Sequence, residues 1–208
     1  MHPLPSGDQK LVQIVDAALA DATRRSGHWL VCRPGCTQCC VGVFSISPLD
    51  ALRLQHGLAE LELNDAERAT RVRTRAEESV ARLAPGFPGD PKTGILFQDE
   101  ASQAAFEGFG NEETCPALDP ETGLCDLYSA RPLTCRAFGP PVQTGDGLGV
   151  CELCFRGASD DQIAACEMPV DPDNLEQKLI AELPENVVTL GDTIVAFALV
   201  TISPQKTP

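Results

Sequence analysis

The residues of this chain that could do chemistry are its ten cysteines. They fall into three groups: Cys32, Cys36, Cys39 and Cys40 in CRPGCTQCC; Cys115, Cys125 and Cys135 at ten-residue steps; and Cys151, Cys154 and Cys166. Thiolates bind zinc and iron and also act as redox nucleophiles. Because groups that are distant in sequence must be assembled by folding, the pattern favours a metal site built in three dimensions.

The first group contains a C-x-x-C pair, Cys36 and Cys39, whose spacing lets a tight turn direct two thiolates to one metal ion. Cys40 follows Cys39 directly, and neighbouring side chains point in different directions. The doublet therefore favours two metal ions, or a multi-iron cluster with a second site. Cys32 and Cys36 are separated by three residues and can reach the same place.

Redox catalysis and simple burial are the alternatives to a metal site. Catalytic redox chemistry at Cys36 and Cys39, or at Cys151 and Cys154, would require a C-x-x-C that opens a helix after a strand. Neither segment predicts that arrangement. Cys166 lies in a predicted helix and is interpreted as a small buried hydrophobic residue.

Two arginines flank Cys135. A site with eight thiolates would carry more negative charge than two divalent ions neutralise. We predict that Arg131 and Arg136 offset this charge through N–H···S contacts from behind the ligands. The alternative for each arginine is a surface ion pair, which contributes little to stability.

The rest of the chain predicts a mostly helical frame. Apolar residues recur at helical spacing before Gly27, and Ser47-Pro48 and Ser159 are typical helix starts. Residues 85–94 predict a loop, 95–113 are ambiguous, and 115–139 predict short strands and loops. Helices are expected at 8–25, 48–57, 64–84, 160–168, 172–183 and 192–202.

The expected fold class is a small α+β protein that is mainly α, with an irregular cysteine-rich metal-binding centre and a few short strands. We expect a single domain over residues 1–208, with a core at 30–155 on which helical extensions at 1–29 and 156–208 pack. A row of arginines on the 64–84 helix is interpreted as a solvated face that pairs with acidic residues. These arginines are Arg68, Arg71, Arg75 and Arg82.

The net charge of −14 comes from 30 acidic and 16 basic residues. Nucleic-acid-binding proteins need a basic surface, so this charge argues against nucleic acid and against an anionic membrane as partners. The N-terminal segment lacks the pattern of a secretion signal, and no apolar run approaches the ~20 residues that span a bilayer. We therefore expect a cytoplasmic protein with reduced thiols and a metal ion as its partner.

The cysteine pattern resembles that of the YkgJ-like cysteine-cluster family, which is described as zinc- or iron-chelating. The family pattern is a C-x-x-C-C group, then CP-x-L, then C-x-x-Y-x-x-RP-x-x-CR, and the resemblance covers residues 30–155. The matching residues are Cys36, Cys39, Cys40, Cys115, Pro116, Leu118, Cys125, Tyr128, Arg131, Pro132, Cys135 and Arg136.

The resemblance implies that eight cysteines bind metal. Counted along the chain, these are Cys32, Cys36, Cys39, Cys40, Cys115, Cys125, Cys135 and Cys151. Cys154 is the alternative to Cys151, because the segment CELCF can supply a ligand from either position. The expected cofactor is iron, with an iron–sulfur cluster as one form of it, or zinc; the dispersed histidines slightly favour iron. The expected function is metal binding, and the alternative is a metal-dependent redox enzyme or a methylase-like protein that uses the cluster.

Overall fold

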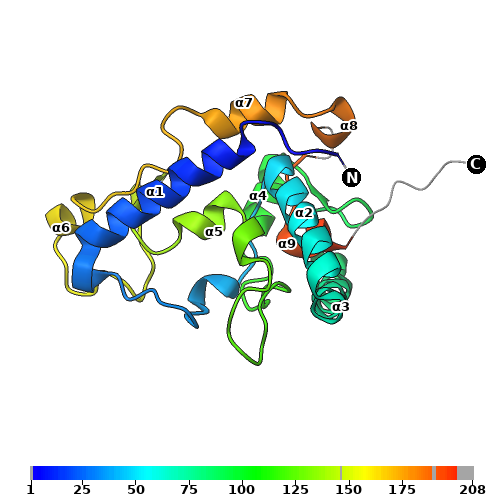
Figure 1. Ribbon diagram of the computed structural model, residues 1–208, viewed down its shortest axis with the longest axis horizontal. Helices are drawn as coiled ribbons and strands as arrows, with labels where there is room; N and C mark the ends of the chain where they lie inside the picture. Colours follow the sequence, from blue (N-terminus) through cyan, green and yellow to red (C-terminus); the bar gives the residue numbers. More distant parts are fainter. Residues whose placement is uncertain (1, 146, 189–190, 201–208) are drawn as a thin grey trace, which may run out of the picture. The chain divides into compact units, whose positions relative to one another are not determined.

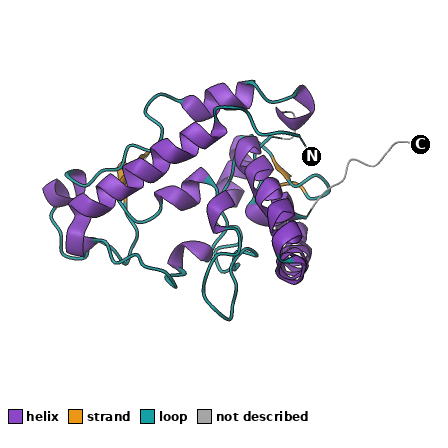
Figure 2. Cartoon of the chain, viewed as in Figure 1, coloured by secondary structure: helices purple, strands orange, loops and turns teal. Residues whose placement is uncertain are grey.

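The computed structural model describes residues 2–145, 147–188 and 191–200. Helices predominate and the strands are short, which confirms the expected fold class (Figure 1, Figure 2). The chain divides into two compact units: the first consists of Met1–Leu4, Thr37–Pro132 and Leu183–Pro208, and the second of Pro5–Cys36 and Leu133–Glu182. The expected core at 30–155 contributes to both units, and a single folding domain stays a prediction.

Two long helices, α2 (Pro48–Asn64) and α3 (Ala66–Leu83), form the frame of the first unit. α2 begins as predicted, because the Ser47 hydroxyl accepts the Asp50 N–H at 3.1 Å and Pro48 occupies the first turn. The helix continues beyond its predicted end at Gly57. A Cβ at Gly57 would lie 2.2 Å from the Cβ of Ala130, so this glycine allows close packing against η4 (Tyr128–Ala130) and does not end the helix.

A hydrophobic core joins α2 and α3 to the short helix α9 (Val195–Leu199). Ala69, Val72 and Ala76 form the buried face of α3, as its apolar stripe predicts. Each well-buried aliphatic side chain of such a core contributes about 1.5–3 kcal/mol. Cys115 and Cys125 pack against this same core, so the loop that carries them is anchored to the buried interior of the unit.

The helix α9 is shorter than the predicted helix at 192–202. It begins at Val195 because Ile46 and Thr193 exchange two backbone hydrogen bonds, of 2.8 and 3.0 Å, which hold the preceding residues in an extended bridge. Residues 201 and 202 of the predicted helix lie outside the described residues.

Short elements complete the first unit. Residues 95–113, ambiguous in sequence, contain one strand and one helix. The strands β1 (Gly89–Asp90) and β2 (Ile95–Leu96) pair antiparallel, with Gly89 opposite Leu96. The elements are η2 (Gln38–Cys40), η3 (Ala84–Gly86), β1 (Gly89–Asp90), β2 (Ile95–Leu96), α4 (Glu100–Glu107) and α8 (Glu185–Val188).

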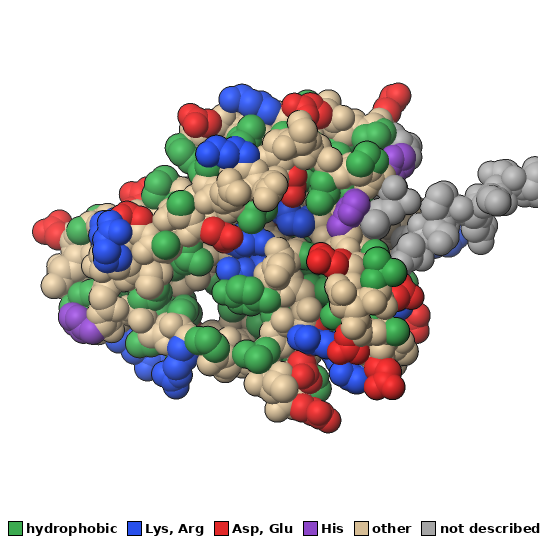
Figure 3. Space-filling model, viewed as in Figure 1, with side chains coloured by type: hydrophobic (Ala, Val, Ile, Leu, Met, Phe, Trp, Pro, Cys, Tyr) green, Lys and Arg blue, Asp and Glu red, His purple; other side chains and the backbone are tan. Residues whose placement is uncertain are grey.

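Arginines of α3 pair with acidic residues, as predicted, but part of this face is buried rather than solvated, because the Asp126 side chain is only 2 % exposed. Arg82 pairs with Glu113, and Arg68 and Arg75 both pair with Asp126. Acidic and basic side chains are accordingly interspersed over α2 and α3, at the lower right of Figure 3. None of the described helices combines the length and the apolar character that crossing a membrane requires.

The second unit is built on α1 (Asp8–Ser26), which packs against α5 (Leu133–Ala137) and α7 (Leu175–Ala181). α1 ends as predicted at Gly27, whose φ of 51° favours glycine. The capping box at Ser159 opens α6 (Asp160–Ala164). This helix ends before the predicted Met168, because the Cys166 and Glu167 N–H groups donate three residues back in turns. The Met168 N–H then donates to the Pro141 carbonyl at 2.8 Å. A hairpin of β3 (Val142–Thr144) and β4 (Gly147–Gly149) completes the unit.

Candidate metal centre

Four thiols of the first unit lie close enough together to interact through their charges. The pKa of Cys40 is raised, first by its hydrogen bond to Cys39 and by burial, and then by the charges of the neighbouring thiols. The same hydrogen bond lowers the pKa of Cys39. Both cysteines of the doublet therefore belong to the same group of thiols, although the sequence favours a separate site for each. We call the four residues the first cysteine set: Cys39, Cys40, Cys115 and Cys125.

Backbone pairing brings distant parts of the first cysteine set together. The Cys115 N–H donates to the Cys40 carbonyl at 2.8 Å, beside an antiparallel bridge between the same two segments. Cys125 then pairs with Leu118 across the predicted turn at 119–123. Three short backbone contacts thus align thiols that are far apart in sequence.

Backbone N–H groups point at two sulfurs of the first cysteine set. The Cys115 sulfur accepts hydrogen bonds from Ala117 and Leu118. The Cys125 sulfur accepts one from Leu127. Burial is the largest influence on both thiols and raises their pKa, to about 12 for Cys115, while the N–H groups oppose this rise. Such hydrogen bonds favour the thiolate, which is the form that binds metal.

Arg131 brings a positive charge to the first cysteine set. Its charge adds to the Cys40 hydrogen bond in lowering the pKa of Cys39, and it opposes the burial that raises the pKa of Cys125. The guanidinium carbon lies 3.9 Å from the centroid of the Tyr128 ring, a cation–π contact that fixes its position. A cation held in this way offsets thiolate charge without being a ligand, and its N–H···S contact stays a prediction.

Arg136 has a different environment. It is buried on α5 in the second unit, and its Nη1 donates to both carboxylate oxygens of Asp16 at 2.8 and 2.9 Å. This pair ties α5 to α1. Cys135 precedes Arg136 on the same helix and is half-buried. Its role as a metal ligand, and a contact of Arg136 with a thiolate, stay predictions.

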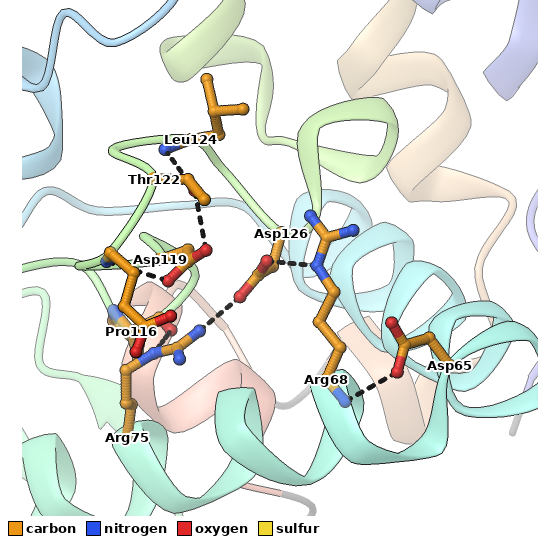
Figure 4. A network of polar contacts seen from close by, with 9 residues as sticks. Asp65, Arg68, Arg75, Pro116, Asp119, Thr122, Leu124 and Asp126 are labelled. Carbon is orange, nitrogen blue, oxygen red and sulfur yellow. Dashed lines mark hydrogen bonds and ion pairs between the residues drawn. The ribbon is translucent and has the colours of Figure 1, made fainter.

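An ion-pair clamp from α3 holds the loop of the first cysteine set (Figure 4). Arg68 and Arg75 approach the carboxylate of Asp126 from different directions, and that side chain is only 2 % exposed. The Arg75 Nε also donates to the Pro116 carbonyl at 2.9 Å. Pro116 follows Cys115 and Asp126 follows Cys125, so the residue after each of these cysteines is attached to α3. Sequence reasoning missed this clamp, and the signal that could have found it is the acidic residue directly after a motif cysteine.

Four thiols of the second unit also lie together. The Sγ atoms of Cys32 and Cys154 are 3.9 Å apart. The pKa of Cys32 is raised to about 12, mainly because its sulfur is partly removed from water, and further by Cys154 and by the charges of the other two thiols. We call these residues the second cysteine set: Cys32, Cys36, Cys151 and Cys154.

A tight turn carries two members of the second cysteine set. The Cys154 N–H donates to the Cys151 carbonyl at 2.9 Å. Burial raises the pKa of Cys151, and the N–H groups of Leu153 and Cys154, which donate to its sulfur, oppose that rise. Phe155 follows in a left-handed conformation with φ of 56° and donates its N–H to the Trp29 carbonyl at 2.9 Å.

The remaining cysteines show what sequence spacing does not decide. Cys36 belongs to the second unit and Cys39 to the first, so the C-x-x-C pair is divided between the units. Joint binding of one ion by this pair stays a prediction. Cys166 is 5 % exposed and packs in an apolar cluster with Cys154, as its interpretation as a buried hydrophobic residue predicts.

As they stand, the described His, Cys, Asp and Glu side chains form no group of three that could hold a metal ion, so binding requires the sulfurs of a set to approach further. The donors nevertheless fit zinc or iron by their chemistry, because each set offers four thiols. In a tetrahedral site with Zn–S bonds of about 2.3 Å, two sulfurs lie about 3.8 Å apart. The separation of 3.9 Å between Cys32 and Cys154 is already close to that value.

One family model matches the chain over residues 31–154 and is described as "CxxCxxCC: Putative zinc- or iron-chelating domain". The match includes both cysteine sets and more than half of the 208 residues. The name of the family has two residues in its first interval, whereas this chain has three between Cys32 and Cys36. Gly35, with φ of 85°, lies within this longer interval. No curated protein and no solved structure matches the chain.

Proposed function

Because the chain belongs to the CxxCxxCC family of zinc- or iron-chelating domains, we propose that it is a metal-binding protein that holds zinc or iron through cysteine thiolates. The first cysteine set supplies the proposed ligands. Four thiolates suit tetrahedral zinc and also suit iron, including an iron–sulfur cluster. Bound zinc supplies a cross-link between loops, whereas bound iron adds electron transfer.

The observation that carries this proposal is the gathering of four thiols, two of whose sulfurs accept backbone N–H groups and two of which feel the charge of Arg131. Backbone N–H groups point at Cys115 and Cys125, and the charge of Arg131 acts on Cys39 and Cys125. Several thiolates in one place repel each other unless such groups surround them. The chain therefore supplies the surroundings that a thiolate metal centre needs.

The cavity that borders the first cysteine set at Cys115 is small. It has a volume of about 20 Å³ and is lined by the chain near Phe44, Glu113 and Val195. That volume holds roughly one water molecule and no larger substrate. We therefore favour a centre that stabilises the fold or senses metal over a catalytic one.

We also propose that the protein works in a reducing compartment such as the cytoplasm. All ten cysteines are free thiols. Thiolate ligands must be reduced to bind metal, and reducing compartments keep them so.

The test is elemental analysis of protein purified without oxygen, together with its absorption spectrum. We expect zinc or iron in a fixed ratio to the chain. Iron with acid-labile sulfide and a broad visible band identifies an iron–sulfur cluster, and zinc without colour identifies a structural site. The variant C115S should lose the metal of the first cysteine set, while C166S, which removes a buried cysteine outside both sets, should keep it. The proposal would be refuted by wild-type protein that contains neither zinc nor iron as purified and binds neither metal when it is added.

A further inference from the structure

We propose that the second unit holds a metal centre of its own, in which the four thiolates of the second cysteine set bind a thiophilic divalent ion such as zinc. This inference rests on the proposed function, because it requires a thiolate metal-binding protein. It assigns the ligands to two independent groups of four, one in each unit. In this assignment both Cys151 and Cys154 are ligands, whereas the sequence analysis treats Cys154 as an alternative to Cys151.

The first step of the argument is the separation of the sulfurs. Cys32 and Cys154 come from segments 122 residues apart, and their Sγ atoms lie at 3.9 Å. Two sulfurs on one tetrahedral zinc ion lie about 3.8 Å apart. Cys36 and Cys151 are close enough to act on Cys32 through their charges. The Cys32–Cys154 separation therefore matches one edge of such a tetrahedron. Binding requires the sulfurs of Cys36 and Cys151 to approach further, because no three of the described side chains form a metal-holding group as they stand.

The second step is the turn that presents Cys151 and Cys154. Its backbone N–H groups already donate to the Cys151 sulfur, as they do around ligands in thiolate metal sites. Phe155 holds a left-handed conformation that costs a non-glycine residue roughly 1–2 kcal/mol. Its burial and its hydrogen bond to Trp29 maintain this turn. Strain that the surroundings maintain is found preferentially at binding sites.

The third step is the space left for Cys32. Gly139 has φ of 117°, and a Cβ there would lie 2.9 Å from the Cys32 sulfur. Glycine is therefore required both by the backbone conformation and by the approach of the thiol. Trp29, Leu30 and Ala158 pack against the apolar cluster that holds Cys154, which is the buried member of the set.

A disulfide between Cys32 and Cys154 is the main alternative. An S–S bond is about 2.05 Å long, well below the observed separation. A disulfide between Cys32 and Cys154 would also not involve the Cys151 sulfur, so it would not account for the two N–H groups that donate to that sulfur. The two alternatives differ in the number of free thiols and in the number of metal ions.

The test uses full-length protein that has been reduced, treated with a chelator and reloaded with Zn²⁺ without oxygen. Zinc per chain is measured by elemental analysis for wild type and three variants. We expect two zinc ions for wild type and for the control C166S. We expect one for C32S/C154S, which removes two ligands of the second set, and one for C39S/C115S, which does the same in the first.

Two outcomes overturn the inference and leave the proposed function standing. If C32S/C154S binds as much zinc as wild type, the second set is not a site. If each double variant loses all zinc, the eight thiols form one shared centre. Wild-type protein that binds no zinc and carries no iron as purified overturns the proposed function itself.

A second measurement protects the test against a variant that does not fold. Wild-type protein is alkylated with and without Zn²⁺, and each cysteine is read by mass spectrometry. We expect zinc to protect all four residues of the second set. If only Cys32 and Cys154 resist alkylation, and only until a reductant is added, they form a disulfide and the inference is wrong.

Discussion

The turns that begin at Cys115 and Cys151 are built alike but are anchored differently. In each turn, the backbone N–H of the residue three positions after the cysteine donates to the cysteine carbonyl. The distance is 3.0 Å for Cys115 and 2.9 Å for Cys151. In each, the sulfur accepts the N–H groups two and three residues on. The same local conformation therefore directs two backbone N–H groups at a cysteine sulfur in both units.

The anchors of the two turns use different forces. The first turn is attached to α3 by charged side chains, through Arg75 on the Pro116 carbonyl and through the ion pairs of Asp126. The second is held by apolar packing of Phe155 and by one backbone hydrogen bond to Trp29. The comparison shows that the same turn can be anchored either by charged side chains or by apolar packing. It also means that the two sets can be weakened separately.

The largest expected effect comes from the apolar anchor. F155A removes a ring that is 4 % exposed, and we expect it to lower the free energy of unfolding by about 3–5 kcal/mol. Zinc protection of the second cysteine set should be lost, and protection of the first should remain. Urea unfolding and alkylation mapping measure these effects.

A matched variant at the same position separates packing from backbone strain. F155G also removes the ring but accepts the left-handed conformation, so it should be about 1 kcal/mol more stable than F155A. Equal stability of the two variants would show that the backbone at this position is not strained.

The next effect comes from the charged anchor. D126N neutralises a carboxylate that is 2 % exposed and leaves Arg68 and Arg75 without their ion pair, so we expect a loss of about 2–4 kcal/mol. Protection of the first cysteine set should fall and that of the second should not. The control E62Q breaks the exposed ion pair between Glu62 of α2 and Arg73 of α3. This variant should lower the free energy of unfolding by less than about 1 kcal/mol. Equal effects of the two variants would mean that the clamp has no special role.

A smaller effect is expected where Cys32 approaches the backbone. G139A places a Cβ 2.9 Å from the Cys32 sulfur and forces a shift of that thiol. We expect the zinc affinity of the second set to fall about tenfold, which corresponds to about 1.4 kcal/mol. The control G157A has a positive φ of 82° but open space around it, so it should reduce stability and leave the affinity unchanged. Zinc titration against a competing chelator distinguishes the two variants.

The features that the sequence predicts correctly depend on neighbours along the chain. The start of α2 at Ser47, the end of α1 at Gly27 and the capping box at Ser159 each involve residues within one helical turn. The gathering of cysteines was also predictable, because thiols that recur in several groups along a chain are typical of a metal site. Local chemistry was therefore enough for the frame and for the class of site.

The features that the sequence does not reveal depend on contacts between distant residues. Gly57 lies inside a helix because Ala130 packs against it, and Arg75 meets Asp126 across 51 positions. Spacing along the chain limits how far apart Cys36 and Cys39 can lie, but it does not decide which unit each one joins. The division of the cysteines into two sets therefore required the fold.

The smallest effect tests the difference between the anchors directly. Raising sodium perchlorate from about 0.1 M to about 1 M shortens the Debye length from about 10 Å to about 3 Å. Ion pairs such as Arg68 with Asp126 weaken under this screening, because the arginine side chain is 37 % exposed. Apolar packing around Phe155 does not weaken in this way. We expect the zinc affinity of the first set to fall about twofold more than that of the second, measured by chelator competition in C32S/C154S and C39S/C115S. An equal change in both variants would mean that screening acts on the thiolates alone, and that the charged anchor does not set the affinity of the first set.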